Sequence, residues 1–163
     1  MLTQEILREN FRYEPETGHL FWIKRSQRRN LSKPISSKNP KGYIQVCTKL
    51  SGKSKTYDIH RLIWIYVYGS IPNQIDHING IRDDNRLCNL REVTHQQNMM
   101  NQAKRSSNKT YKGIYLSSNK KKWVAEICFN YKRKYLGSFD TPEQASEVYN
   151  NAAKEIFKEF ART

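Results

Sequence analysis

Residues 74–98 read QIDHINGIRDDNRLCNLREVTHQQN, and the rest of this 163-residue chain is interpreted around them. The stretch places many polar side chains among a few apolar ones. The polar set is Asp76, His77, Asn79, Asp83, Asp84, Asn85, Asn89, His95 and Asn98, and the apolar set is Ile75, Ile78, Leu87, Leu90 and Val93. A hairpin that only completed a hydrophobic core would not need so many polar side chains, so a functional site is expected here.

Local signals within the stretch predict two strands followed by a helix. Residues 74–79 have the content of a short strand, and Asn79-Gly80 is a strong turn signal. The cluster Asp83, Asp84 and Asn85 extends that turn into a loop, and we interpret these three residues as turn formers, with a contribution to the functional site as the alternative. A second strand is expected around residues 90–93.

The helix should begin after Thr94, because Gln97 three residues later completes a capping-box pattern. It is expected to continue through Asn101. Asn98 would then lie in the first turns of the helix, where it can face the first strand. The whole stretch is therefore predicted to be a ββα unit.

Four of these residues resemble the ββα-metal site of the HNH nuclease family, in the branch found in phage and intron homing endonucleases. Asp76 and His77 are adjacent, Asn89 follows the His by twelve residues, and Asn98 follows nine residues later. The resemblance implies that Asp76 and Asn98 bind one divalent cation, that His77 is the general base, and that Asn89 holds the imidazole. His95 remains an alternative to Asn98 as the second ligand.

These residue types suit Mg²⁺ or Mn²⁺, with one ion per site. A hard cation prefers oxygen ligands and keeps several waters, so one carboxylate and one amide leave positions for phosphate oxygens. A neutral imidazole, with an ordinary pKa of ~6.5, can take a proton from water. No zinc is expected, because Cys47, Cys88 and Cys128 are far apart and form no C-x-x-C pair.

The charge of the chain favours a polyanionic partner. The formal net charge is +14, from 29 Lys and Arg against 15 Asp and Glu, so double-stranded DNA is the first candidate. No apolar run approaches the ~18 residues of a membrane span, and residues 1–10 lack a signal-peptide core. We therefore expect no membrane partner and a cytoplasmic location, in a bacterial host if the gene belongs to a phage. Monomer and homodimer both remain open.

Residues 1–72 are predicted to build the remainder of the first domain. The expected elements are a helix at 5–10, a turn at 13–18, strands at 20–23, 43–48 and 55–59, and a buried helix at 60–68 that ends at Gly69. A basic loop at 24–41 could contact phosphate or could simply be solvated. The order of Tyr13 to Gly18, Gly42-Tyr43, His60-Arg61-Leu62 and Gly69 to Pro72 also resembles phage HNH endonucleases; His60 is interpreted as a structural partner rather than a second base.

A second module is predicted after the polar stretch NQAKRSSNK at 101–109. Residues 112–115, 122–127 and 134–139 read as three strands, and a helix follows that is capped by Thr141 and Gln144. Its apolar stripe should cover one face of the sheet. The stripe is Ala145, Val148, Tyr149, Ala152, Ala153, Ile156, Phe157 and Phe160.

This second module resembles the DNA-binding domain of plant ethylene-response factors (the Apetala type), through YKGIY, KWVAEI and YLGSFDTPEQA. The resemblance implies that the sheet lies in the major groove, with contacts from Lys112, Tyr115, Trp123, Lys134 and Tyr135. Charge adds further residues, because the strands are basic and the helix is acidic. They are Lys120, Lys121, Lys122, Lys132 and Arg133. Lys112, Tyr115, Cys128 and Tyr135 stand where the plant proteins have Arg or Trp, so the plant target sequence is not carried over.

The sequence thus predicts an α+β protein in two parts. The first is an HNH nuclease domain at 1–102, with its ββα-metal core at about 74–102. A linker at 103–110 leads to a domain at 111–163 with a three-stranded antiparallel sheet packed on one helix. The predicted function is metal-dependent cleavage of duplex DNA, as in a homing endonuclease, by a nick or a double-strand cut at a site that the sequence does not specify. The alternative is a DNA-binding regulator without catalysis.

Overall fold

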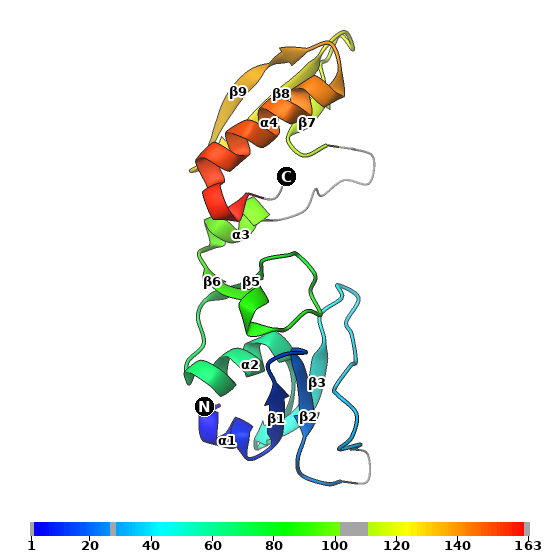
Figure 1. Cartoon of the computed structure of the whole chain (residues 1–163), viewed down its shortest axis with the longest axis vertical. Helices are drawn as coiled ribbons and strands as arrows, with labels where there is room; N and C mark the ends of the chain where they lie inside the picture. The colour runs from blue at the N-terminus through cyan, green and yellow to red at the C-terminus, as the bar shows by residue number, and fades with distance from the viewer. Residues whose placement is uncertain (1, 27–28, 102–110, 162–163) are drawn as a thin grey trace. The chain divides into compact units, whose positions relative to one another are not determined.

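The computed structural model describes residues 2–26, 29–101 and 111–161, and these form an α+β fold (Figure 1). The class predicted from the sequence is confirmed. The chain divides into two compact units, Met1–Val93 and Thr94–Thr163. The predicted linker at 103–110 lies outside the described residues, so the domain limits 1–102 and 111–163 stay predictions.

In its described residues, the first unit has three two-stranded antiparallel sheets and two α-helices. In chain order the elements are α1 (Gln4–Arg8), β1 (Phe11–Glu14), β2 (His19–Trp22), β3 (Gln45–Ser51), β4 (Lys53–Asp58), α2 (Ile59–Tyr68), β5 (Gln74–His77), the 3-10 turn η1 (Leu87–Asn89) and β6 (Leu90–Val93). Consecutive strands pair as β1–β2, β3–β4 and β5–β6. Each sheet therefore pairs two strands that follow one another directly in the chain.

Helix α2 supplies much of the core of this unit. Leu62 and Ile63 are fully buried, and they belong to a cluster that includes Leu7, Phe11 and Leu20 from the first segments of the chain. The helix ends at Gly69, whose φ of +78° permits the left-handed cap and whose N–H bonds the Ile65 carbonyl at 2.8 Å. The buried helix predicted at 60–68 and its glycine end are confirmed.

The stretch at 74–98 follows the predicted order of strand, loop, strand and helix, with two differences. Strand β5 ends at His77 rather than at Asn79, because Gly80 N–H already bonds the His77 carbonyl in a turn, at 2.8 Å. The 3-10 turn Leu87–Asn89 precedes β6 and was not predicted. The antiparallel register places Asp76 opposite Arg91, and His77 opposite Leu90.

The second unit begins with α3 (His95–Asn101) and continues with a three-stranded antiparallel sheet. The strands are β7 (Ile114–Leu116), β8 (Trp123–Phe129) and β9 (Lys132–Phe139), and they are followed by α4 (Pro142–Phe157) and the 3-10 turn η2 (Lys158–Phe160). The two predicted capping boxes are present. Thr94 and Gln97 bond each other's backbone N–H at 3.2 and 2.8 Å, and Thr141 and Gln144 do the same at 3.3 and 3.4 Å.

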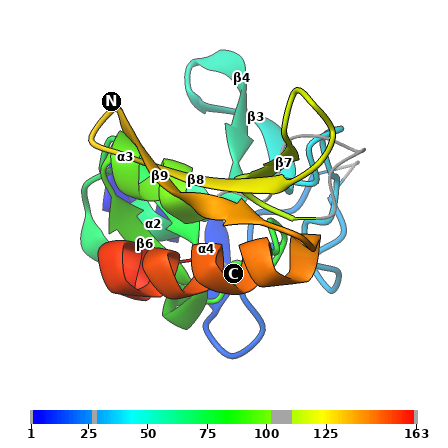
Figure 2. The same cartoon turned by 90° about the horizontal axis from the view of Figure 1, so that it is seen from above.

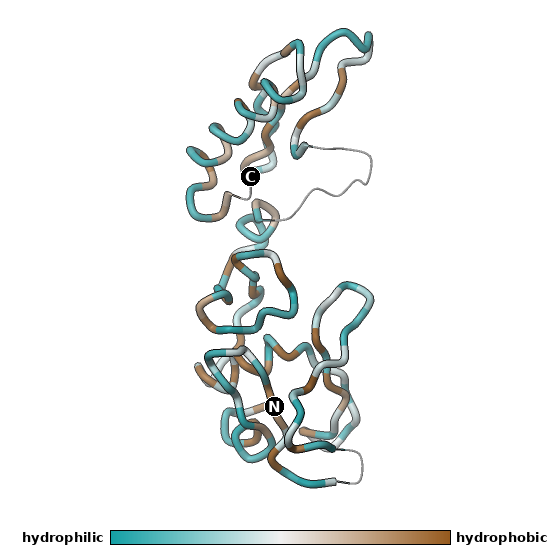
Figure 3. Tube along the Cα trace, turned by 45° about the vertical axis from the view of Figure 1, so that its right-hand side comes forward, coloured by the Kyte–Doolittle hydropathy of each residue, from teal (hydrophilic) through white to brown (hydrophobic). Residues whose placement is uncertain are grey.

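Helix α4 lies across one face of this sheet (Figure 2). Hydrophilic and hydrophobic residues alternate along its turns (Figure 3). Ala145, Tyr149, Ala153 and Phe157 are buried against Ala125 and Ile127 of β8, as the apolar stripe predicted. In the part of the chain that is described, no helix combines the length and the apolar character needed to cross a membrane.

Candidate active site

Asp76 and His77 lie at the end of β5, and both side chains are buried, with 8% and 4% of their surface exposed. Because neighbouring strand residues point to opposite faces, the two side chains leave the strand on different sides. Arg91, opposite Asp76 on β6, donates to Asp76 Oδ2 from Nε at 3.1 Å and from Nη2 at 2.9 Å. The ion pair therefore fixes the orientation of this carboxylate.

The imidazole of His77 is held by Asn85. His77 Nε2 lies 3.2 Å from Asn85 Oδ1, and the Asn85 side chain is almost fully buried, at 1% exposed. Asn85 Nδ2 donates to the Asp83 carbonyl at 3.4 Å, which orients the amide with its oxygen toward the ring. An amide oxygen only accepts hydrogen bonds, so Nε2 carries the hydrogen and the lone pair of the neutral ring is on Nδ1.

This arrangement corrects the role predicted for Asn89. Asn89 Oδ1 accepts from Asn79 N–H at 2.9 Å, and its Nδ2 donates to the Asp84 carbonyl at 2.8 Å. Asn89 therefore ties together the two ends of the loop after β5, whereas Asn85 contacts the imidazole. The sequence suggested turn formation for Asn85, because its signal is the same as that of its neighbours Asp83 and Asp84.

Two aromatic residues complete the surroundings of His77. The ring of His60 lies 5.1 Å from the ring of His77, nearly perpendicular to it, and the ring of Tyr43 lies within 5.8 Å. Burial lowers the pKa of His77, and the hydrogen bond to Asn85 and the charge of Asp76 oppose that shift. Burial also lowers the pKa of His60 to about 4, with His77 nearby adding to the effect. Both imidazoles are therefore neutral at neutral pH.

The loop that carries Asn85 has its own polar network. Arg86 donates to both carboxylate oxygens of Asp84, from Nε at 2.8 Å and from Nη2 at 2.7 Å. Asn79 Nδ2 also donates to Asp84, at 2.8 Å. Mainly because of the hydrogen bonds from Arg86, the pKa of Asp84 is lowered to about 2. These contacts restrain the loop, so Asn85 is presented to His77 by an ordered segment.

The side chains of the site can be compared with the ligands that a hard divalent cation prefers. Asp76 is a buried carboxylate at the edge of a strand pair, which is the type of oxygen donor that Mg²⁺ and Mn²⁺ prefer. Among the described residues, no group of three or more His, Cys, Asp or Glu side chains is placed to hold a metal. Asp76 supplies one oxygen donor of this type, and the cation itself stays a prediction.

The candidates for the second ligand belong to the other unit. Asn98 lies in α3, and its N–H bonds the Thr94 carbonyl at 3.0 Å within that helix. His95, at the start of α3, lines a cavity of about 310 Å³ together with Met99, Tyr149 and Phe157 of the same unit. The choice between Asn98 and His95 stays a prediction.

The residues predicted to bind DNA in the second unit differ in their surroundings. Tyr135 is 59% exposed, and Tyr115 is exposed with its hydroxyl donating to Glu126 at 2.8 Å. The exposed cations are Lys120, Lys121, Lys122, Lys132, Arg133 and Lys134. Two residues have structural contacts instead: Lys112 Nζ donates to the Met100 carbonyl at 2.6 Å, and Trp123 packs partly against the core.

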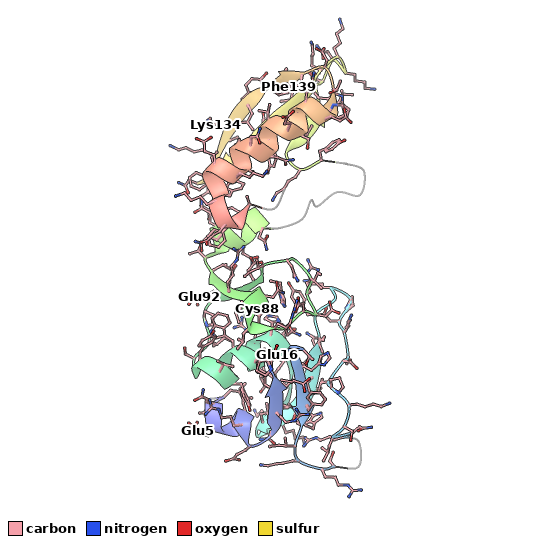
Figure 4. All side chains as sticks on the ribbon, in the orientation of Figure 1. Glu5, Glu16, Cys88, Glu92, Lys134 and Phe139 are labelled. Carbon is pink, nitrogen blue, oxygen red and sulfur yellow. The ribbon has the colours of Figure 1, made fainter. Side chains whose placement is uncertain are left out.

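Figure 4 labels two residues of β9, Lys134 and Phe139. Lys134 is exposed, and Phe139 packs partly against the core cluster. Their strand partners, Ile127 and Trp123, both belong to that cluster, so the two side chains leave β9 on the face that packs on α4. Lys122 carries an ion pair with Asp140, so not every cation in this region is available to phosphate in the same way.

Comparisons with known proteins locate a similarity in the middle of the chain. Residues 57–100 match the family model described as HNH endonuclease. An uncharacterised HNH endonuclease of Acanthamoeba polyphaga mimivirus is 36% identical over 119 residues, which cover 68% of this chain and 62% of that protein. The DNA endonuclease I-HmuI of Bacillus phage SP01 is 33% identical over 94 residues, which cover 56% of this chain and 51% of the relative. This chain therefore spans between half and two thirds of the length of these relatives.

A solved structure described as DNA binding and cleavage by the HNH homing endonuclease I-HmuI aligns with 85% of this chain and 76% of its own chain, at 25% identity and a TM-score of 0.46. The matched residues 57–100 contain Asp76, His77, Asn89 and Asn98. Residues 57–100 are thus similar in sequence to HNH endonucleases.

Proposed function

We propose that this protein is a metal-dependent DNA endonuclease of the HNH type, which recognises a site on duplex DNA in the manner of homing endonucleases. The observation that carries the proposal is the buried Asp76-His77 pair, in which each side chain is oriented by a partner of its own. Arg91 holds the carboxylate and Asn85 holds the imidazole. The match of residues 57–100 to HNH endonucleases supports the same activity.

His77 is the general base in this proposal. Its Nε2 is engaged with Asn85, so Nδ1 accepts the proton of the attacking water. Burial lowers the pKa of the ring, and this keeps it in the neutral form that can accept a proton. Water then attacks phosphorus, the bond to the 3′ oxygen breaks, and His77 retains the proton taken from the nucleophile. This pairing of a base with an orienting residue is the arrangement expected for activated nucleophiles.

Asp76 and Asn98 would hold one Mg²⁺ or Mn²⁺, with His95 as the alternative to Asn98. When bound, the cation stabilises the charge that develops on the phosphate and on the departing oxygen. Arg91 keeps Asp76 in place and reduces the cost of burying its negative charge.

The exposed face of the β7–β9 sheet is the proposed site of DNA recognition, as in the ethylene-response-factor domains that the second unit resembles. The face opposite α4 carries exposed Tyr115 and Tyr135, and basic residues lie along the strands and their turns. Cations on this face would contact phosphates, and tyrosines would contact bases or sugars. Glu126 lies on the same face, so the surface is not uniformly basic. The proposed location is the cytoplasm of a bacterial host, should the gene belong to a phage.

Two alanine variants separate the proposed roles. His77→Ala should still bind Mn²⁺ but cut DNA about 10²- to 10⁴-fold more slowly, because only the proton transfer is lost. Asp76→Ala should lose Mn²⁺ binding, measured by electron paramagnetic resonance of the free ion, and should lose cleavage as a consequence. The matched control is Asp83→Ala, which removes a partly exposed carboxylate, paired with Lys38, from the loop between β5 and β6. Parental cleavage by His77→Ala would remove the proposed base and with it the HNH mechanism.

A further inference from the structure

The β1–β2 hairpin lies outside residues 57–100, yet it contacts the loop that orients His77. Tyr13 of β1 is buried, and its hydroxyl lies between two backbone groups of that loop. The hydroxyl donates to the Asn85 carbonyl and accepts from Leu87 N–H, both at 3.2 Å. One side chain from the beginning of the chain therefore fixes the backbone on both sides of Arg86.

The turn of the same hairpin packs on the same peptide group. A Cβ atom at Gly18 would lie 2.6 Å from Asn85 C and 2.5 Å from Arg86 N. Contacts this short do not occur, and the opposing atoms are backbone, so they cannot rotate away as the end of a side chain can. Gly18 also has a φ of +72°, which disfavours any other residue. The close approach thus depends on glycine at this position.

The peptide group that Tyr13 and Gly18 contact is that of Asn85, the residue whose side chain contacts His77. The Asn85 side chain has almost no exposed surface, and its Oδ1 is 3.2 Å from His77 Nε2. A shift of the 85–87 backbone would move Oδ1 relative to the ring, because a buried side chain in a packed interior has little freedom to compensate. The contacts form a continuous path from Tyr13 and Gly18, through Asn85, to His77.

We propose that Tyr13 and Gly18 are positioning residues of the active site, which act on His77 through Asn85. This inference rests on the proposed function, since it takes His77 to be the general base. It means that the segment similar to HNH endonucleases is incomplete on its own, and that the first hairpin supplies part of the scaffold of the site.

The first test replaces the hydroxyl of Tyr13 in the full-length protein. Tyr13→Phe keeps the ring in the core and removes both hydrogen bonds, while Tyr66→Phe, whose ring lies 6.2 Å from that of Tyr13, is the matched control. The tautomer of His77 is read from the ring ¹⁵N chemical shifts of histidine-labelled protein, without metal or DNA, at a pH where the ring is neutral. Tyr13→Phe should reduce the population of the Nε2–H form, and Tyr66→Phe should leave it unchanged.

The kinetic readout is cleavage of supercoiled plasmid in the presence of Mg²⁺. Tyr13→Phe should lower kcat by about 10- to 100-fold, as expected when a reacting group is displaced by a remote change. KM should stay at the parental value, because Tyr13 is buried and does not contact DNA. A variant that was merely less stable would keep its kcat and the His77 signals at temperatures well below its melting point.

The second test uses two glycines that share a backbone conformation. Gly18 and Gly52 have φ values of +72° and +87°, but a Cβ at Gly52 would meet nothing within 4 Å. Gly18→Ala and Gly52→Ala therefore introduce similar backbone strain, and only the first should disturb the His77 ring signals. If Gly18→Ala does not fold, the comparison of Tyr13→Phe with its control Tyr66→Phe still tests the role of the hairpin.

The experiments test the proposed function and the role of the hairpin separately. A wild-type protein that did not cut DNA would refute the proposed function, while the ¹⁵N measurement would still show whether the hairpin positions His77. A folded Tyr13→Phe variant with the wild-type tautomer and the wild-type kcat would overturn the role assigned to the hairpin.

Discussion

His60 makes the stability of the first unit dependent on pH, and the structure sets the size of the effect. The imidazole is buried between Tyr43 and His77, and its pKa is lowered from 6.5 to about 4. The unfolded chain therefore binds a proton at a higher pH than the folded chain does. The contribution of the neutral His60 imidazole to the unfolding free energy is fully present above pH 6.5. It is lost as the pH falls toward about 4.

The difference between 6.5 and about 4, at about 1.4 kcal/mol for each pH unit, corresponds to about 3 kcal/mol of unfolding free energy. His60→Phe keeps an aromatic ring in the same position and removes the titration. Urea denaturation of the wild type and the variant, followed by fluorescence of Trp22 and Trp64 in the same unit, should show that the wild type loses about 3 kcal/mol more between neutral pH and about pH 4.

Other groups also change protonation in this pH range. The test therefore compares the pH dependence of stability in the wild type with that in His60→Phe, and does not rely on the wild-type profile alone. Burial lowers the pKa of His77 as well, which adds a contribution of the same sign to both proteins. His19→Phe makes the same substitution at an exposed position of β2 and is the matched control for the change of residue type. Parallel profiles for the wild type and His60→Phe would refute the reasoning, because the buried neutral imidazole would then contribute nothing.

Two further predictions follow from the loop after β5 and from the sheet of the second unit. Asn89→Ala should lower stability by about 1–3 kcal/mol in thermal or urea unfolding, because Asn79 N–H and the Asp84 carbonyl lose their partner; an unchanged stability would contradict the loop-tying role. Replacing Lys120, Lys121 and Lys122 together by Ala should reduce the slope of log Kd against log salt by up to ~0.9 for each phosphate that the protein no longer neutralises. The control replaces Lys154 of α4 and Lys158, which follows that helix, by Ala, and the salt slope should then stay unchanged. If the two sets of substitutions changed the slope equally, the sheet would not be the DNA-binding face.

Much of the secondary structure could be predicted because its signals are local. The capping boxes at Thr94 and Thr141 satisfy backbone donors within three residues, and the structure contains both. The glycine end of α2 and the apolar stripe of α4 are equally local, since each depends on backbone conformation or on the period of one helix. These features require no knowledge of how distant segments pack.

The partner of His77 could not be predicted, because it depends on how the loop is closed. Asn85 and Asn89 offer the same amide at positions four residues apart, and both are buried. Which of them reaches the ring is decided by the 3-10 turn Leu87–Asn89 and by the contact of Tyr13 with the loop, 74 residues from Leu87 in sequence. Arg91 as the partner of Asp76 likewise follows from the strand register, which the sequence did not specify residue by residue.

The most direct test of the central claim is cleavage of supercoiled plasmid DNA by the purified full-length protein. With Mg²⁺, the wild type should convert the plasmid to nicked or linear forms, EDTA should abolish the reaction, and His77→Ala should slow it by at least about 10²-fold. Cleavage that persisted in EDTA, or that proceeded at the parental rate in His77→Ala, would contradict metal-dependent hydrolysis through the Asp76-His77 site.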